Sequence, residues 1–407
     1  NASDNLAETP DDPRGMSALQ GLGTMRFRLG RHEDALKDLA AARAAARKAG
    51  ARQREIGIVL DESLVLDWVG DWTRSGALAA EAEALAAAGS TPLLDARLVY
   101  AQGRMFHRAD KPAEASALFE KSAAMAEALG ADGYETQVLS LSLAGWDFSL
   151  LRRFDEAEGV FSRLIATCEE RNDMLNMTVA LNNRAILSLL SQKTERLLQD
   201  FRRLIVIARE SGLPLVECST MKDLGEVQYL LGETGSEEQV RRSIEVSRQV
   251  LGPLTRGTLT AELLLARVLA YRGDAEGAVA VVNTIRQAQA EARGAGQTDA
   301  EFVAGEELFV EIVGLSGGSD DEARWADILA RAHQLTLQPQ DVIEMMEFEA
   351  LSLWRAGKAP QARAVLESTI DEASKSAEIM LARLRRSRES LAAEPRASAA
   401  SQAGQVA

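Results

Sequence analysis

Aromatic residues and prolines are scarce in this chain. Aromatic residues make up 5% of the 407 residues and there are nine prolines, so long segments run without interruption. Those segments are rich in Ala, Leu, Arg and Glu, which favour the α-helix. No run of alternating β-branched residues occurs that would predict a sheet. The composition therefore predicts an all-helical protein.

Excess positive charge and long apolar runs are also lacking. The formal net charge is −15, whereas proteins that bind nucleic acid through its phosphates, or an anionic membrane surface, need a positive surface. No stretch of about eighteen apolar residues occurs, so no transmembrane helix is predicted. The first residue is Asn1 and no signal-peptide pattern follows. We therefore expect a chain that is cut from a longer protein or processed.

Cysteine is nearly absent, with only Cys168 and Cys218 in the chain. Each lies on the apolar face of a predicted helix, where a cysteine usually serves as a small buried side chain. We expect both thiols to be reduced, rather than joined in a disulfide or paired as metal ligands. Reduced cysteines favour a cytoplasmic location.

What the sequence does contain is a repeat, in which small residues return about every forty positions. Gly103 is followed at offsets of seven, twelve, sixteen and nineteen residues by Asp110, Ala115, Phe119 and Ser122. The same offsets recur after seven other small residues, which are Gly23, Ser63, Gly145, Ala185, Gly225, Ala266 and Ala350. In the unit that starts at Gly225, one residue is missing after the turn.

The offsets describe a helix, a short polar turn and a second helix. A small residue on each helix lets the two axes cross closely, whereas a bulky side chain there would push them apart. One such pair cannot bury its apolar face alone, so successive pairs must stack. We therefore predict an all-α, right-handed α-solenoid of about nine helix pairs with a C-terminal capping helix.

This pattern resembles the tetratricopeptide repeat over most of the chain. "LNNRAILSLL", residues 181–190, is similar to the Leu-Asn-Asn motif of kinesin light chain repeats, with Arg184 where that motif usually has an apolar residue. The stretch from "GLPLVECSTMKDLGEVQYLLGE" to "LLLARVLAYRGD" resembles the arrays of large bacterial signalling proteins. Those proteins carry a Ser/Thr kinase or an ATPase module upstream, so the resemblance implies a sensor or docking arm.

The domain organisation follows the repeats. Residues 1–15 are acidic and contain proline, and we expect them to be mobile. The solenoid is predicted over 16–372, with an irregular helix pair near 294–341, where two Gly-rich polar stretches weaken the pattern. A capping helix is expected over 373–393. The tail 394–407 has few bulky apolar residues and is predicted to be disordered.

Residues that usually carry catalysis or bind cofactors lack the required spacing. His32, His107 and His333 have no Cys, Asp or Glu partners at a recurrent metal-ligand spacing. The chain contains no Gly-x-Ser-x-Gly nucleophile elbow and no Gly-Lys-Ser/Thr phosphate loop. We therefore predict no catalytic residue, no cofactor, no metal site and no enzymatic activity.

A basic run lies near the C-terminus and consists of Arg383, Arg385, Arg386 and Arg388. These guanidinium groups could bind an acidic partner, but the interpretation that we favour is a solvated terminal helix.

The candidate binding surface is the concave groove that the first helices of such pairs line. Positions near each leading small residue should face this groove. They predict a set of partner-binding residues: Asp61, Arg97, Arg104, His107, Asn182, Asn183, Asp223, Glu226, Tyr229 and Arg267. Asn183 could clamp a peptide backbone because its amide both donates and accepts. Arg97 and Arg104 could bind a carboxylate, and Asp223 with Glu226 would favour a basic side chain.

These observations predict a scaffold or docking module that binds a protein or peptide within a bacterial signalling assembly, without catalysis. The partner could include an upstream kinase or ATPase module of the same polypeptide, and neither nucleic acid nor a membrane is expected. The alternative is a ligand- or peptide-sensing arm of a multidomain regulator. An enzyme that uses the groove as its active site is a more remote alternative.

Overall fold

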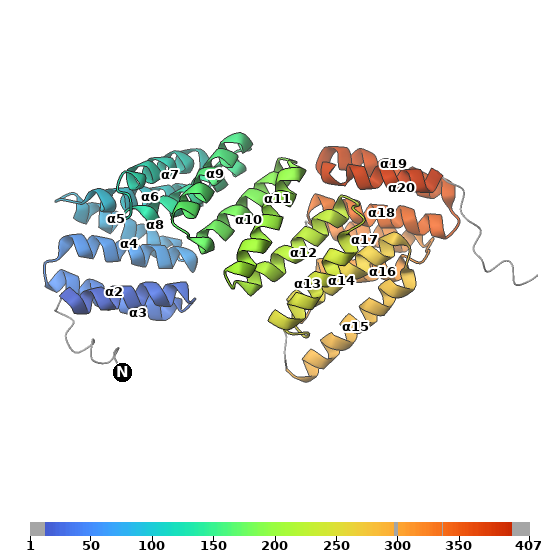
Figure 1. Ribbon diagram of the computed structural model, residues 1–407, viewed down its shortest axis with the longest axis horizontal. Helices are drawn as coiled ribbons and strands as arrows, with labels where there is room; N and C mark the ends of the chain where they lie inside the picture. The colour runs from blue at the N-terminus through green and yellow to red at the C-terminus, as the bar shows by residue number, and fades with distance from the viewer. Residues whose placement is uncertain (1–12, 297–299, 336, 393–407) are drawn as a thin grey trace, which may run out of the picture. The chain divides into compact units, whose positions relative to one another are not determined.

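The computed structural model describes residues 13–296, 300–335 and 337–392. Within these ranges the chain consists of α-helices, a single 3-10 turn and short connections, with no strand (Figure 1). The helices form nine successive pairs, followed by one further C-terminal helix. The predicted all-α solenoid with a C-terminal helix is therefore confirmed.

The chain divides into two compact units, residues 1–187 and 188–407, which we call the N-terminal and C-terminal units. The N-terminal unit contains α2 (Pro13–Arg28), α3 (His32–Lys48), α4 (Arg52–Trp68), α5 (Trp72–Ala86), α6 (Pro92–Arg108), α7 (Pro112–Glu127), α8 (Tyr134–Leu150), α9 (Phe154–Glu170) and most of α10 (Met174–Leu190). Among these, α2, α4, α6 and α8 are the first helices of their pairs, and each contacts the next one along the chain.

The C-terminal unit contains α11 (Thr194–Glu210), α12 (Pro214–Leu230), α13 (Ser236–Val250), α14 (Arg256–Arg272), α15 (Ala275–Gly294), α16 (Ala304–Leu315), α17 (Glu322–Gln334), α18 (Pro339–Arg355), α19 (Ala359–Ser376), η1 (Glu378–Met380) and α20 (Leu381–Ala392). Its first helices α12, α14, α16 and α18 also contact one another in order, and α20 follows α18. The first helices therefore form the layer on which a binding surface is expected.

The two helices of a pair cross closely at the glycines that lead the repeats, as predicted. A Cβ atom on Gly103 would lie 2.7 Å from the ring of Phe119, and one on Gly145 would lie 2.6 Å from the ring of Phe161. Both rings are fully buried. The same crossing joins Gly23 to Leu39 and Gly225 to Val240, each at 2.8 Å. At these positions, the side chain of the second helix packs directly on the backbone of the first.

The turn between the two helices of a pair has one backbone conformation throughout. Every residue seven positions after a leading small residue has a positive φ, and five of these residues are glycines: Gly30, Gly70, Gly232, Gly273 and Gly357. The other three are Asp110 (φ 54°), Arg152 (φ 58°) and Gln192 (φ 59°). After each of these three, the next backbone N–H reaches back to a carbonyl of the first helix, which closes the helix end.

Helix starts are capped locally at several pairs. The carboxylate of Asp71 accepts from the backbone N–H of Arg74 at 3.1 Å, and that of Asp274 accepts from Gly277 at 2.9 Å. Pro92 follows Thr91, whose hydroxyl accepts from Leu94 at 3.3 Å. These caps satisfy backbone donors that the first helical turn leaves without partners.

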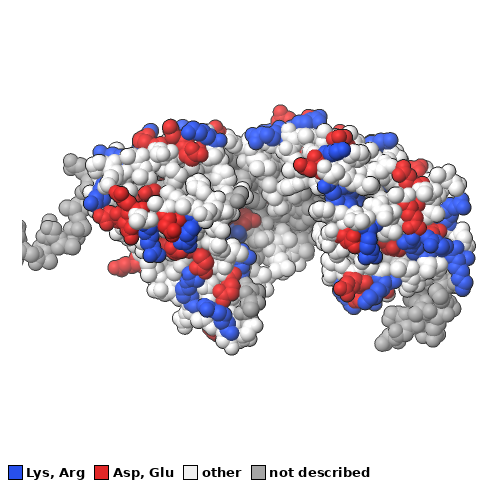
Figure 2. All heavy atoms as spheres, turned by 180° about the vertical axis from the view of Figure 1, so that it is seen from behind, with Lys and Arg blue, Asp and Glu red and all other residues white. Residues whose placement is uncertain are grey.

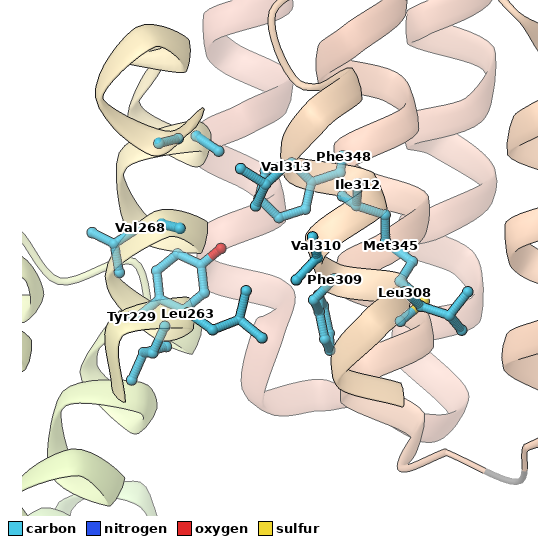
Figure 3. Close-up of a cluster of buried hydrophobic side chains, with 14 of the residues drawn as sticks. Tyr229, Leu263, Val268, Leu308, Phe309, Val310, Ile312, Val313, Met345 and Phe348 are labelled. Carbon is cyan, nitrogen blue, oxygen red and sulfur yellow. The ribbon is translucent and has the colours of Figure 1, made fainter. Parts of the chain in front are cut away.

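The irregular region contains two short helices, α16 and α17, of 12 and 13 residues, after a long α15 of 20 residues. Helix α16 is nevertheless deeply packed, because Leu308, Ile312 and Val313 are buried. Figure 3 shows these α16 side chains beside Met345 and Phe348 of α18. The short pair thus continues the apolar core of the C-terminal unit.

The ends of the solenoid differ in detail from the expected boundaries. Helix α2 begins at Pro13, inside the segment 1–15, and residues 1–12 lie outside the described part of the chain. Helix α19 continues to Ser376, so the final helix starts at Leu381 rather than at 373. The predicted tail 394–407 also lies outside the described residues.

Both cysteines are free and buried, as predicted. The Cys218 sulfur lies 2.9 Å from the hydroxyl oxygen of Ser247. None of the helices in the described ranges is long and apolar enough to cross a membrane. On the face shown in Figure 2, basic and acidic side chains are interspersed.

Candidate functional site: one pocket in each unit

The N-terminal unit has a pocket of about 540 Å³ that is lined mainly by α2, α4, α6 and α8. Its polar lining includes Ser17, Gln20, Thr24, Arg28, Asp61, Arg97, Tyr100, Arg104, Asp132, Glu135 and Thr136. Apolar side chains from the same helices complete the wall, among them Met25, Leu60, Leu64, Leu93 and Leu139.

Asp61 links three helices inside this pocket. Its carboxylate accepts from the Gln20 side chain at 2.7 Å and forms an ion pair with Arg97 at 2.5 Å. Arg97 also donates to the backbone oxygen of Gly57 at 3.3 Å. Asp61 and Arg97, both predicted groove residues, therefore lie together in the pocket, and Arg97 already has an acidic partner.

Arg104 also lines the pocket, but it is 5% exposed and belongs to a buried ion pair. Asp67 binds Arg104 and Arg108 together, and the Arg104 guanidinium also donates to the Ser63 hydroxyl at 3.2 Å. Burial, with the nearby Arg108 charge, lowers the pKa of Arg104 to about 9. This guanidinium therefore holds α4 and α6 together more than it faces open space.

His107 does not line this pocket. Its Nδ1 lies 2.6 Å from a carboxylate oxygen of Asp147, a fully buried residue on α8. His107, which was predicted to face the groove, instead links α6 to α8 through this contact.

The C-terminal unit has a second pocket, of about 570 Å³, between the first helices α12, α14, α16 and α18. It is lined by charged residues (Lys222, Glu226, Arg256, Arg267, Glu306 and Asp341), by apolar residues (Leu263, Leu264, Val303, Phe309 and Leu337), and by Gly257, Thr260 and Gly305. We call this cavity the C-terminal pocket.

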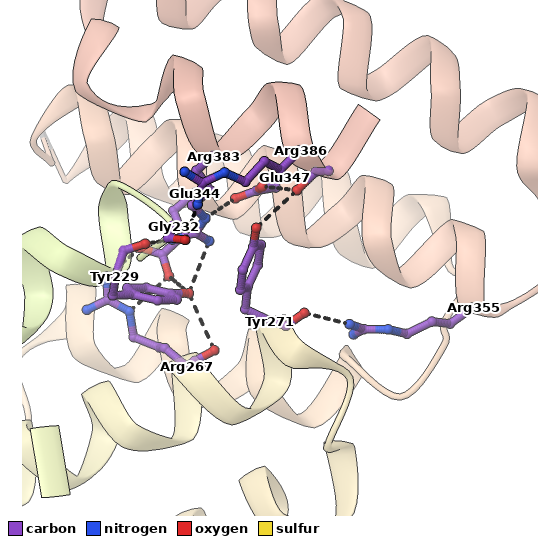
Figure 4. A network of polar contacts seen from close by, with 10 residues as sticks. Tyr229, Gly232, Arg267, Tyr271, Glu344, Glu347, Arg355, Arg383 and Arg386 are labelled. Atoms are coloured by element: carbon purple, nitrogen blue, oxygen red, sulfur yellow. Dashed lines mark hydrogen bonds and ion pairs between the residues drawn. The ribbon is translucent and has the colours of Figure 1, made fainter. Parts of the chain in front are cut away.

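Arg267 and Glu344 form the floor of the C-terminal pocket. The Arg267 Nε lies 3.1 Å from Glu344, its Nη1 lies 3.0 Å from Glu226, and its guanidinium stacks 4.0 Å from the Phe309 ring centroid. Figure 4 shows Arg267 beside Glu344, and the Tyr229 hydroxyl donates to Glu344 at 2.7 Å. Burial would raise the pKa of Glu344, but Arg267 and Arg383 hold that pKa below its usual value. The floor is therefore a rigid, ionised network.

Two predicted groove residues take other places in the C-terminal unit. The prediction that Tyr229 faces the groove is wrong, because its side chain is 1% exposed and its hydroxyl is used by Glu344. Asp223 pairs with Lys222 at 3.0 Å and stays partly exposed, but it is not among the residues that line the pocket. Burial raises the pKa of Asp223, against the opposing effect of Lys222.

No family model and no curated protein matches this chain. Solved structures do match it in fold. The apo form of RapI matches with a TM-score of 0.66 at 10% identity, over 92% of this chain and 98% of RapI. Aspartyl phosphate phosphatase F from Bacillus subtilis matches with a TM-score of 0.55 at 13% identity, over 89% and 94%.

A third match is a Signal Transduction ATPase with Numerous Domains protein with a tetratricopeptide repeat sensor, from Pyrococcus horikoshii. Its TM-score is 0.54 at 9% identity, over 89% of this chain and 53% of that protein. The fold is that of a tetratricopeptide-like repeat array. The resemblance seen in the repeat offsets is thereby confirmed.

Asn182 and Asn183 lie on α10 of the repeat array, and both are partly exposed. Neither is among the residues that line the two pockets. Their neighbour Arg184 is buried, and its guanidinium donates to the Ser162 hydroxyl at 3.0 Å. Ser162 on α9 therefore gives Arg184 a polar partner, which explains how a charged residue can occupy a position that is usually apolar in the Leu-Asn-Asn motif.

The interpretation of the basic run as a solvated helix is wrong for Arg383. This residue is fully buried, and its guanidinium stacks on the rings of Tyr229 and Tyr271, with centroid distances of 4.1 and 4.2 Å (Figure 4). Arg385 and Arg388 are exposed, and Arg386 is exposed but donates to the Gly232 carbonyl. Arg383 therefore has its partners inside the array and is not exposed to a separate acidic protein.

Glu344 and Asp341 are two of the acidic residues at the C-terminal pocket that the sequence analysis missed. Glu344 stands six residues before Ala350, the same offset that separates Arg97 from Gly103. The signal for Glu344 was therefore present just after the irregular stretch near 294–341, whereas Asp341 is the last residue of that stretch. Within the described residues, no group of three His, Cys, Asp or Glu side chains is placed to hold a metal ion.

Proposed function

We propose that this repeat array recognises a protein or peptide segment through the pockets of its first helices and makes or breaks no covalent bond. The observation that carries the proposal is the C-terminal pocket, in which the buried Arg267 of α14 pairs with Glu226 of α12 and Glu344 of α18 and stacks on Phe309 of α16 before any ligand arrives. A preformed site of this kind avoids part of the ordering cost of binding.

The lining of both pockets supports recognition of an extended chain. Volumes of about 540 and 570 Å³ lie in the range of ligand sites, which combine an apolar wall with a few fixed polar groups. A peptide offers both kinds of surface at short intervals. The Pyrococcus horikoshii protein, whose repeat array is called a sensor, shares the fold and supports a role in signal recognition.

We further propose that the array is the docking or sensing module of a larger signalling assembly. Arg97, Arg104, Glu226 and Arg267 would shape the two pockets. Asn182 and Asn183 would contact the backbone of a longer partner, because an amide can donate and accept together. An upstream kinase or ATPase module of the same polypeptide is the partner that the sequence resemblance favours.

The experiment is selection of a displayed random heptapeptide library on the complete chain. One bulky substitution then fills each pocket: Thr24→Tyr in the N-terminal pocket and Thr260→Tyr in the C-terminal pocket. Ser374→Tyr, at an exposed position of α19, is the matched control. Binding of the selected peptides should be lost in one pocket variant and kept in the control. Failure to select any peptide, or binding that both pocket variants retain, would overturn the proposal.

A further inference from the structure

The cations of the C-terminal pocket are all engaged. Lys222 pairs with Asp223 at 3.0 Å, and Arg256 pairs with Glu306 at 3.0 Å. The third cation is Arg267, whose guanidinium is shared between Glu226 and Glu344. A ligand that enters this pocket therefore meets guanidinium and ammonium groups that are already neutralised.

Asp341 is different, because no Lys, Arg or His of the described residues forms an ion pair with it. It stands in the first turn of α18, where the backbone N–H of Gln338 favours the ionised form of its carboxyl. The side chain lines the pocket together with Glu226, whose own side chain is 31% exposed. Before Asp341 is added, four carboxylates thus surround the three cations: Glu226 and Glu306 of the pocket, Glu344 of its floor, and Asp223 beside Lys222.

The electrostatic field at Asp341 is negative on balance. Burial raises the pKa of Asp341 to about 6; Arg267 opposes that rise, while Glu344 and Glu226 add to it. Two other ion pairs of the pocket add no net charge. They are Lys222 with Asp223, both on α12, and Arg256 of α14 with Glu306 of α16. With Asp341 included, the carboxylates outnumber the cations by two, so the site can accept a further positive charge.

Apolar side chains lie on the same walls. Phe309, Leu263 and Leu264 line the pocket, and Val303 is 50% exposed at its edge. The alkyl stem of a lysine or arginine can lie along such a surface while its charged head reaches a carboxylate. An anionic ligand would instead place like charges together in a partly buried site, which is unfavourable.

We propose that the C-terminal pocket selects a peptide segment by a Lys or Arg side chain, which Asp341 and Glu226 receive while the apolar wall packs against a flanking residue. This inference rests on the proposed function and adds the chemical class of the recognised residue.

The proposal fixes the sign of a pH effect. A bound cation favours the ionised form of Asp341, so binding lowers the pKa of this carboxyl. Protonation of Asp341 below about pH 6 therefore opposes binding. The affinity for a basic peptide should be higher at pH 7.5 than at pH 5 by linkage.

The test uses the heptapeptides that the complete chain selects from the random display library. We expect enrichment of Lys or Arg beside an apolar residue. Asp341→Asn keeps an acceptor for the Gln338 N–H and should weaken those peptides about tenfold, the loss of one charge-assisted contact. Asp371→Asn, at an exposed position of α19, should leave binding unchanged.

The outcomes separate this inference from the proposed function. Selected peptides that are acidic or uncharged, or basic peptides that bind Asp341→Asn as well as the wild type, would overturn the inference while leaving peptide recognition intact. Basic peptides whose binding survives Thr260→Tyr would also overturn it, because their site would lie elsewhere. Selection of no peptide at all would overturn both.

Discussion

Arg383 of α20 and Glu347 of α18 form an ion pair with 2.7 Å between Nε and Oε2, and neither side chain is exposed to solvent. The pair lies between the tyrosine rings of α12 and α14, so the last helix is joined to helices that precede it by more than a hundred residues. An ion pair at this depth is costly to desolvate, and the loss of one partner leaves the other charge uncompensated.

Replacing Arg383 by alanine should therefore destabilise the C-terminal unit by about 3–5 kcal/mol. Burial already raises the pKa of Glu347, although Arg383 opposes that rise. Urea unfolding followed by circular dichroism measures the change, and Arg385→Ala, at an exposed position of the same helix, is the control. The double variant Arg383→Met with Glu347→Gln should recover much of the loss. If Arg383→Ala unfolds like the control, the ion pair does not stabilise this unit.

The helix crossings predict a contrast between glycines that look alike in sequence. Gly103→Ala and Gly145→Ala place a methyl group less than 3 Å from a buried phenylalanine ring, and overpacking of this kind costs about 1–3 kcal/mol. Gly159 lies within α9, and a Cβ there meets no atom within 4 Å. Gly159→Ala should instead stabilise by about 0.5–1 kcal/mol through helix propensity. Thermal unfolding of the three variants checks the sign of each change.

The positive φ of the turns predicts where substitution by glycine should stabilise the protein. Arg152 has a φ of 58°, in a region that costs an L-residue about 1–2 kcal/mol. Arg152→Gly should stabilise by about 1 kcal/mol, since glycine removes this strain but loses more backbone entropy on folding. Asp110→Gly should gain less, because Asp tolerates the left-handed region better. The reverse change, Gly70→Ala (φ 81°), should destabilise. An unchanged unfolding midpoint for Arg152→Gly would contradict the strain.

Asp341 predicts a pH-dependent stability in the absence of ligand. A folded-state pKa of about 6, against the ordinary aspartate value of 3.8, means that the folded protein holds this proton more tightly than the unfolded chain does. The resulting stability is present below about pH 4 and is lost as the pH rises to about 6. Asp341→Asn should therefore be the more stable protein at pH 7 by about 3 kcal/mol, and close to the wild type at pH 4. Urea unfolding at the two pH values measures the difference, and equal gains at both would argue against an unpaired carboxylate.

Prediction from sequence worked best for features that are local or periodic. The offsets from Gly103 to Asp110 and to Phe119 located a turn with positive φ and a close crossing. Both depend on residues less than twenty positions apart. The rule for groove residues selected Arg97, Asp61, Arg267 and Glu226. In the structure, Arg97 pairs with Asp61 and Arg267 pairs with Glu226. It failed for Tyr229, because periodicity says which side of a helix a residue is on but not what covers that side.

The sequence by itself determined the helix pairs, their turns and the small residues at the crossings, because each follows from backbone sterics and side-chain size within one repeat. Only the tertiary structure decided which charges remain available to a ligand. From sequence, Arg383 is predicted to be a solvated cation. In the structure, it contacts Tyr229, which lies 154 residues earlier in the chain. Asp341 stands out only when the partners of every neighbouring cation are known. Pairing of charges depends on distances in space between distant repeats, and a repeat pattern does not contain those distances.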